Sequence, residues 1–153
     1  MHAGTKQLAP NKIEDKLLPK ELRRPHPLYP NRRKDQEKAL DFVKNLLYCK
    51  IPKICLENPV GVISTKIRKP DQIIHPWMFG DEASKSTCLW LKNLPLLKPT
   101  KIVGRGEFLV AKSGRRGAKW NWGLPPSKDR SRIRSKTFRG IAEAFATQWG
   151  GIL

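Results

Sequence analysis

The chain has 153 residues, which suits a single domain with a modest hydrophobic core. Its formal net charge of +18, from 31 basic against 13 acidic residues, favours a polyanionic partner, and nucleic acid is the usual one; a generally basic surface is the alternative. A hydrophobic content of 39% argues against a wholly disordered chain, and no apolar run reaches the roughly 18 residues of a transmembrane helix.

Residues 1–32 are basic and interrupted by prolines at positions 10, 19, 25, 27 and 30, so we expect an extended N-terminal arm. Residues 33–153 are expected to form one domain. A helix is predicted over residues 34–48, because apolar side chains recur there at three- and four-residue spacing. Asn31 is a candidate cap for this helix, and Ile51-Pro52 ends the pattern.

A short apolar run at residues 53–56 predicts a strand, and Glu57-Asn58-Pro59 predicts a turn after it. Helix, tight connection and strand together indicate an α/β fold, in which the carboxyl ends of strands carry the chemistry. Glu57 and Asn58 are therefore candidate catalytic residues. A protonated carboxyl group can donate to the ring nitrogen of a flipped cytosine, while its other oxygen accepts from the exocyclic amine. An ordinary turn is the alternative, which these three residues alone favour.

A second strand is predicted at residues 87–91. Residues 101–136 then form a basic, glycine-rich segment that contains Trp120 and Trp122. Because cations neutralise phosphates and aromatic rings stack on bases, we expect a DNA-facing loop here; a disordered basic loop with packed tryptophans is the alternative. The candidate DNA-binding residues are Arg68, Lys85, Arg105, Arg115, Arg116, Lys119, Trp120, Arg130, Arg132 and Arg134.

The last predicted helix covers residues 137–149, where Phe138, Ile141, Phe145 and Trp149 share one face, and Gly150-Gly151 ends it.

The three cysteines, Cys49, Cys55 and Cys88, are odd in number and form no CxxC pair, so neither a disulfide framework nor a metal site is expected. Reduced, packed thiols fit a cytoplasmic location. No signal peptide is expected, because the N-terminus shows no apolar segment. His75 is expected to be a packing residue.

Taken together, four stretches resemble the C-terminal portion of phage and bacterial DNA cytosine (C5) methyltransferase-like proteins, over about residues 27–150. The stretches are residues 54–64, which include Ile54-Cys55-Leu56-Glu57-Asn58-Pro59; residues 68–80, with Pro76-Trp77-Met78-Phe79-Gly80; residues 85–95, with Thr87-Cys88-Leu89-Trp90-Leu91; and residues 135–150.

The resemblance implies a class I methyltransferase fold with a Rossmann-type sheet, S-adenosylmethionine as cofactor, and methyl transfer to carbon 5 of cytosine in DNA. In the family a cysteine thiolate adds to carbon 6 while a glutamate holds the base at N3, and Glu57 matches that glutamate. The better-known enzymes have Glu-Asn-Val at this turn, whereas this chain has Glu-Asn-Pro.

Two departures from the family pattern stand out. The cofactor-binding glycine loop is not found, and no cysteine follows a proline as the nucleophile does in the family. We therefore expect a partial, truncated sheet with an exposed edge strand. We also expect that this chain alone does not bind S-adenosylmethionine. A complementary methyltransferase half or a second copy of the chain is the expected partner besides DNA.

Three functions remain open at this point. The chain is one half of a split enzyme, or a non-catalytic basic DNA-binding protein, or a structural or inhibitory phage protein that binds an acidic protein. Whether the chain is an enzyme by itself is left open, and no membrane partner is expected.

Overall fold

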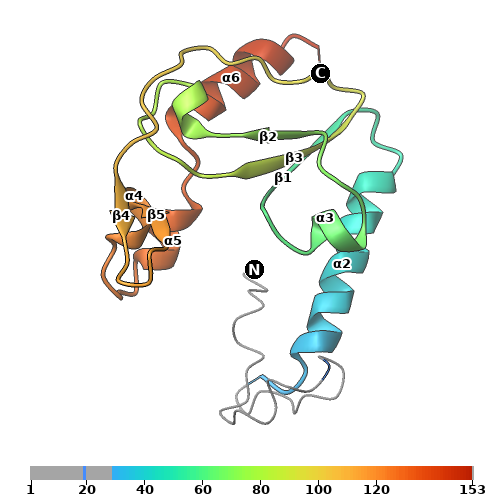
Figure 1. The fold of residues 1–153 in the computed structure, drawn as a ribbon. Coiled ribbons are helices and arrows are strands. Elements are labelled where there is room, and N and C mark those ends of the chain that lie inside the picture. Colours follow the sequence, from blue (N-terminus) through green and yellow to red (C-terminus); the bar gives the residue numbers. More distant parts are fainter. Residues whose placement is uncertain (1–18, 20–28, 153) are drawn as a thin grey trace. The chain divides into compact units, whose positions relative to one another are not determined.

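The structure, a computed structural model, describes residue 19 and residues 29–152 (Figure 1). Most of the predicted arm at residues 1–32 lies outside these described residues. The chain divides into two compact units, the first formed by residues 1–50 and 61–68 and the second by residues 51–60 and 69–153. We describe each unit by itself.

The first unit contains helix α2 (Arg32–Tyr48) and the short helix α3 (Ile63–Lys66). The predicted helix at 34–48 is confirmed and begins two residues earlier. Asn31 occupies the cap position through its backbone, whose carbonyl accepts from the N–H of Asp35 at 3.0 Å, but its side chain makes no capping bond. The helix ends at Cys49, where the backbone becomes extended (φ −64°, ψ 167°).

The second unit is built on a three-stranded sheet of β1 (Ile54–Pro59), β2 (Gln72–Ile74) and β3 (Thr87–Lys92), in the order β1-β3-β2. Both pairings are antiparallel, and β3 is the central strand. The strands predicted at 53–56 and 87–91 are confirmed in position. The described residues thus contain both helices and strands, which agrees with the α/β prediction as far as the content of secondary structure is concerned.

The predicted turn at Glu57-Asn58-Pro59 is wrong, because these residues continue strand β1. Glu57 is paired with Leu89, and Pro59 with Thr87 at the end of the ladder. Proline is tolerated there because β1 lies at an edge of the described sheet, where one row of backbone groups needs no ladder partner. Pairing with β3 therefore overrides the turn preference of Asn-Pro.

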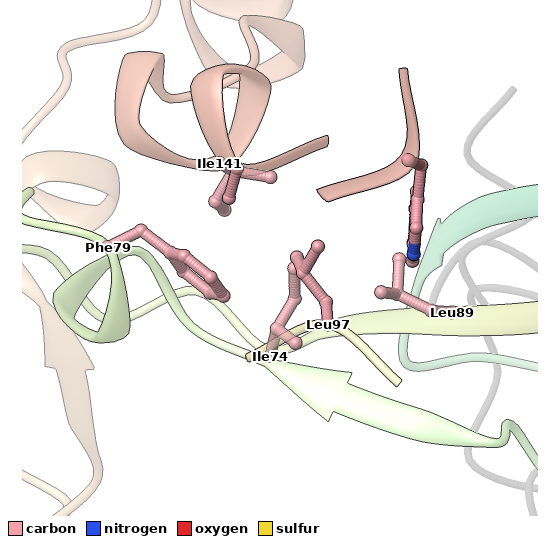
Figure 2. Packing of buried hydrophobic residues seen from close by; sticks show 7 residues of the cluster. Ile74, Phe79, Leu89, Leu97 and Ile141 are labelled. Atoms are coloured by element: carbon pink, nitrogen blue, oxygen red, sulfur yellow. The ribbon is translucent and has the colours of Figure 1, made fainter. Parts of the chain in front are cut away.

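Helix α6 (Arg139–Trp149) packs on one face of the sheet and closes the hydrophobic core (Figure 2). The predicted helix at 137–149 is confirmed from residue 139 onward. The buried core residues come from β2, β3, the connections and α6, and they are Ile74, Phe79, Leu89, Leu97, Ile141, Ala144 and Trp149.

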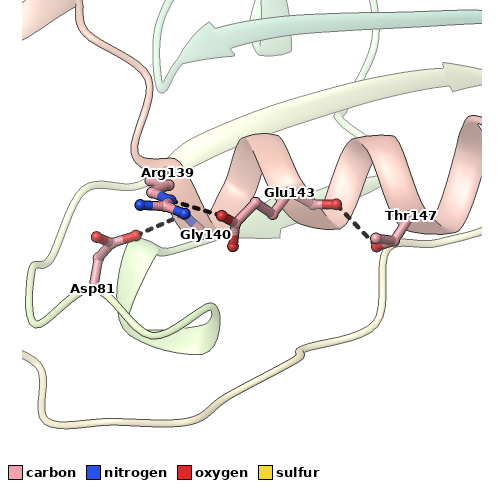
Figure 3. Close-up of polar contacts among 5 residues, drawn as sticks. All are labelled: Asp81, Arg139, Gly140, Glu143 and Thr147. Atoms are coloured by element: carbon pink, nitrogen blue, oxygen red, sulfur yellow. Dashed lines mark hydrogen bonds and ion pairs between the residues drawn. The ribbon is translucent and has the colours of Figure 1, made fainter.

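The start of α6 is tied to the loop after the 3-10 helix η3 (Pro76–Met78) (Figure 3). The backbone N–H of Gly140 donates to the carboxylate of Asp81 at 3.0 Å. On the exposed side of the helix, Arg139 donates to Glu143 at 2.7 Å. The Asp81 carboxylate thus satisfies a backbone donor in the first turn, which has no partner within the helix.

Two glutamine side chains hydrogen-bond to the backbone of Leu97 and Lys98, in the segment that follows β3. The Gln72 side chain donates to the backbone oxygen of Leu97 at 2.7 Å and accepts from its N–H at 2.9 Å. Gln148 makes the same pair of bonds with Lys98, each at 2.8 Å, on the exposed side. We expect Gln72→Ala to lower the free energy of unfolding by about 2 kcal/mol, because two half-buried backbone groups lose their partners. Gln148→Ala should cost about half as much, because water replaces the lost bonds; equal losses in urea unfolding would contradict this.

Candidate nucleic-acid interface

The carboxylate of Glu57 is exposed on strand β1. Paired residues in an antiparallel ladder share a face, so Glu57 lies on the face of Leu89, which also carries α6. Asn58 is opposite Cys88 and faces the other way, half-buried. The structure thus presents Glu57 to solvent at the edge of the sheet and does not bring the Asn58 side chain to the same face.

The cysteines near Glu57 are poor nucleophiles. Burial, reinforced by the negative charge of Glu57, raises the pKa of the Cys55 thiol to about 11. The same two causes raise the pKa of Cys88. Cys49 donates its S–H to the backbone oxygen of Leu46 at 3.1 Å. All three are free thiols, and Cys55 and Cys88 are protonated packing residues at neutral pH.

The basic segment at 101–136 is not a plain loop. It contains a hairpin of β4 (Phe108–Val110) and β5 (Arg116–Ala118), followed by the short helices α4 (Lys119–Trp122) and α5 (Arg130–Ser135). Gly114 makes the turn with φ +77°, and its N–H donates to the oxygen of Ala111 at 2.9 Å. A sequence signal that could have predicted this hairpin is the apolar run Phe108-Leu109-Val110 followed by Ser113-Gly114.

A pocket of about 390 Å³ lies between this hairpin and the residues that follow β2. Its lining includes His75, Trp77 and Ser86 from one side of the sequence and Arg105, Phe108 and Arg116 from the other. The N–H of Val103 donates to the oxygen of Trp77 at 2.9 Å, which ties the two segments together. Tertiary contacts therefore bring four stretches of the chain, around residues 75–77, 84–86, 105–108 and 116–118, to one pocket.

Both pocket arginines stack on aromatic rings. The guanidinium carbon of Arg105 lies 5.1 Å from the centroid of the Trp77 ring, and that of Arg116 lies 5.1 Å from the Phe108 ring. His75 stacks on Trp77 with ring centroids 5.8 Å apart. Burial, with the positive charge of Arg105 as the second cause, lowers the pKa of His75, so this ring is neutral at pH 7.

The charge of the pocket is not cancelled by acidic neighbours. Lys119 pairs with Glu107, and Arg132 with Asp129. Within residues 29–152, by contrast, no carboxylate pairs with Arg105 or Arg116, and none lines the pocket. Both pocket arginines therefore carry positive charge that no described carboxylate offsets.

The other candidate DNA-binding residues are dispersed. Trp120 packs edge-on against Phe138 and donates its indole N–H to the oxygen of Ser84 at 3.0 Å, so its surroundings favour a packing role. Arg115 is exposed beside the pocket, and Lys85 lies half-buried between two serines that line it.

Three of the predicted cations, Arg130, Arg132 and Arg134, lie on α5. Arg130 and Arg134 are half-buried there, and the Nε of Arg130 has no hydrogen-bond partner among the described residues. Arg68 belongs to the first unit. Sequence reasoning missed His75, Trp77, Ser86 and Phe108, because nothing in the local pattern connects them with Arg105 and Arg116.

A second hollow, of about 460 Å³, lies between β1 and α6. Its lining is mostly apolar and includes Cys55, Leu94, Phe145 and Trp149. It adjoins the edge strand that carries Glu57. The predicted exposed edge strand is thus accompanied by an apolar groove in the second unit.

Comparisons with protein-family models, with curated proteins and with solved structures returned no match to this chain. In the part of the chain that the structure describes, no helix combines the length and the apolar character needed to cross a membrane.

Proposed function

We propose that this chain is the base-binding portion of a DNA cytosine methyltransferase-like protein. The observation that carries the proposal is the exposed carboxylate of Glu57 on an edge strand, within a stretch that resembles the family's glutamate segment. The class I, Rossmann-type sheet is part of the proposal: further strands of such a sheet would add to the free edge of β1.

Glu57 would act on the Watson–Crick edge of an extruded cytosine. When protonated, its carboxyl group donates to N3 and accepts from the amine at carbon 4, so it binds, orients and protonates the base. Uracil presents the reverse pattern, with a donor at N3 and an acceptor at carbon 4, so a carboxyl group whose proton faces N3 does not match it. Recognition by Glu57 is therefore the step that this chain's own residues can supply.

The residues that the structure describes do not fit S-adenosylmethionine. A ribose hydroxyl needs an acceptor such as a carboxylate, and no carboxylate lines either of the two pockets. The described thiols near Glu57 are protonated, as their raised pKa values require. The cofactor and the nucleophile would therefore come from a complementary polypeptide segment, for which the edge of β1 and its apolar groove offer a docking surface.

The proposal is tested by base preference rather than by methyl transfer. Short single-stranded oligonucleotides with one central cytosine or uracil are titrated against the wild type, Glu57→Ala and Glu57→Gln. We expect the wild type to prefer cytosine by about 10-fold, the size of one good two-bond base contact. Glu57→Ala should lose the preference, while Glu57→Gln should keep it, because an amide also donates to N3 and accepts from the amine.

Glu37→Ala is the matched control. Glu37 is exposed on α2, and this substitution removes the same charge as Glu57→Ala. It should leave the preference unchanged. A wild-type chain that binds both oligonucleotides equally would sink the base-binding proposal.

The second candidate function is a non-catalytic, basic DNA-binding protein. The unpaired Arg105 and Arg116 beside the exposed Arg115 favour it, because such charges bind phosphates without reading sequence. This function predicts tight DNA binding that Glu57→Ala leaves unaltered for every base. The same oligonucleotide titration therefore separates the two candidates.

A further inference from the structure

The pocket between the hairpin and the residues after β2 has the composition of an anion site. Arg105 and Arg116 both line it, and neither is neutralised by a carboxylate in the described part of the chain. Their stacking on Trp77 and Phe108 holds each guanidinium plane in place. Arginine held in this way keeps its N–H donors for a partner, and its planar fork matches phosphate oxygens.

One of the residues that line the pocket has a buried polar atom without a partner in the described part of the chain. Nδ1 of His75 is buried, and no hydrogen bond to it exists among residues 29–152. The hydroxyl of Ser86 lines the same pocket. A buried polar atom is normally hydrogen-bonded, and one that is not points to a missing ligand or water.

The size of the pocket argues for more than a bare anion. About 390 Å³ lies within the range of small-ligand sites, whereas a phosphate group fills only a fraction of it. The rest of the lining combines the rings of His75, Trp77 and Phe108 with small residues. Aromatic rings are surfaces on which unpaired bases pack.

We infer that this pocket binds one unpaired nucleotide of a DNA strand, with its phosphate on Arg105 and Arg116 and its sugar and base against the aromatic rings. The inference rests on the proposed function and names the unit of DNA that the hairpin holds. The pocket is lined by none of the residues of β1, so it is a site separate from Glu57.

Calorimetric titration at low salt, in a phosphate-free buffer, tests the inference with three probes: dCMP, inorganic phosphate and deoxycytidine. We expect saturable binding of dCMP, about 10-fold tighter than either fragment, because only dCMP uses both the arginines and the aromatic rings. Arg105→Gln and Arg116→Gln should each weaken dCMP binding by about 10-fold, the loss of one charged hydrogen-bond partner.

Arg115→Gln is the matched control, because Arg115 is the exposed neighbour of Arg116, carries the same charge and does not line the pocket. It should change the affinity for dCMP by less than twofold. An equal loss for Arg115→Gln and Arg116→Gln would show diffuse attraction and overturn the pocket assignment. Absence of saturable dCMP binding would overturn it as well.

A trinucleotide distinguishes a nucleotide within a strand from a free nucleotide. Without a terminal phosphate it should bind as well as its 5′-phosphorylated form, because an internal phosphate serves the arginines; dependence on the terminal phosphate would overturn the assignment to DNA. Arg116→Gln should weaken dCMP binding by the same factor with and without Glu57→Ala, because Glu57 does not line the pocket. A wild-type chain that binds dCMP but shows no cytosine preference would refute only the proposed function. A wild-type chain that shows the preference but no saturable dCMP binding would refute only this inference.

Discussion

Gly140→Ala is expected to destabilise the second unit by about 2 kcal/mol, the typical cost of overpacking a core. A Cβ atom at this position would overlap with the backbone oxygen of Phe79 and would lie 3.1 Å from the Asp81 carboxylate. The Phe79 oxygen cannot yield cheaply, because the Phe79 side chain is buried in the core beneath α6. The hydrogen bond from Gly140 to Asp81 would be displaced together with the helix.

The sign of this change is diagnostic. Alanine normally stabilises a helix by about 0.5–1 kcal/mol relative to glycine, so a loss can come only from the close approach of α6 to Phe79. Gly151→Ala is the control, because no atom lies within 4 Å of a Cβ added there. Thermal unfolding should show a fall of roughly 10 °C for Gly140→Ala and little change for Gly151→Ala. A higher melting temperature for Gly140→Ala would show that α6 does not pack as described.

DNA affinity is expected to fall by a factor of about 10² to 10³ when salt rises from 50 to 200 mM. Each neutralised phosphate contributes a slope of about −0.9 in log K against log salt, so about five contacts give this loss. Arg105, which precedes the hairpin, and Arg115 and Arg116 within it supply the largest part, since none of them pairs with a carboxylate among residues 29–152. The measurement is a fluorescence anisotropy titration with duplex and single-stranded DNA.

A comparison of the salt slope per neutralised arginine at two sites locates this effect on the surface. Neutralising Arg115 and Arg116 together should reduce the salt slope by about 2, because neither pairs with a carboxylate in the described part of the chain. Arg132→Gln should reduce it by less than 1, because Arg132 already pairs with Asp129. No binding to DNA at 50 mM salt would instead favour an acidic protein as the partner.

The sequence alone determined the local elements whose patterns are strong. Helices α2 and α6 follow from apolar side chains at helical spacing, and β1 and β3 from short apolar runs, because these patterns are properties of neighbouring residues. The exposed Glu57 could be anticipated as a candidate from its segment. Cys55 and Cys88 could be judged structural from the strands that carry them.

Only the tertiary structure decided how these elements are combined. Glu57 to Pro59 extend a strand because β3 pairs with them, which the turn preference of Asn-Pro conceals. The hairpin at 108–118 meets Trp77 and His75 through contacts between residues some thirty positions apart. Such tertiary contacts depend on which surfaces of the elements pack together, and the periodicity of the sequence carries no information about this packing. The arginine pocket is therefore a product of packing, while the helix and strand positions are products of the local sequence.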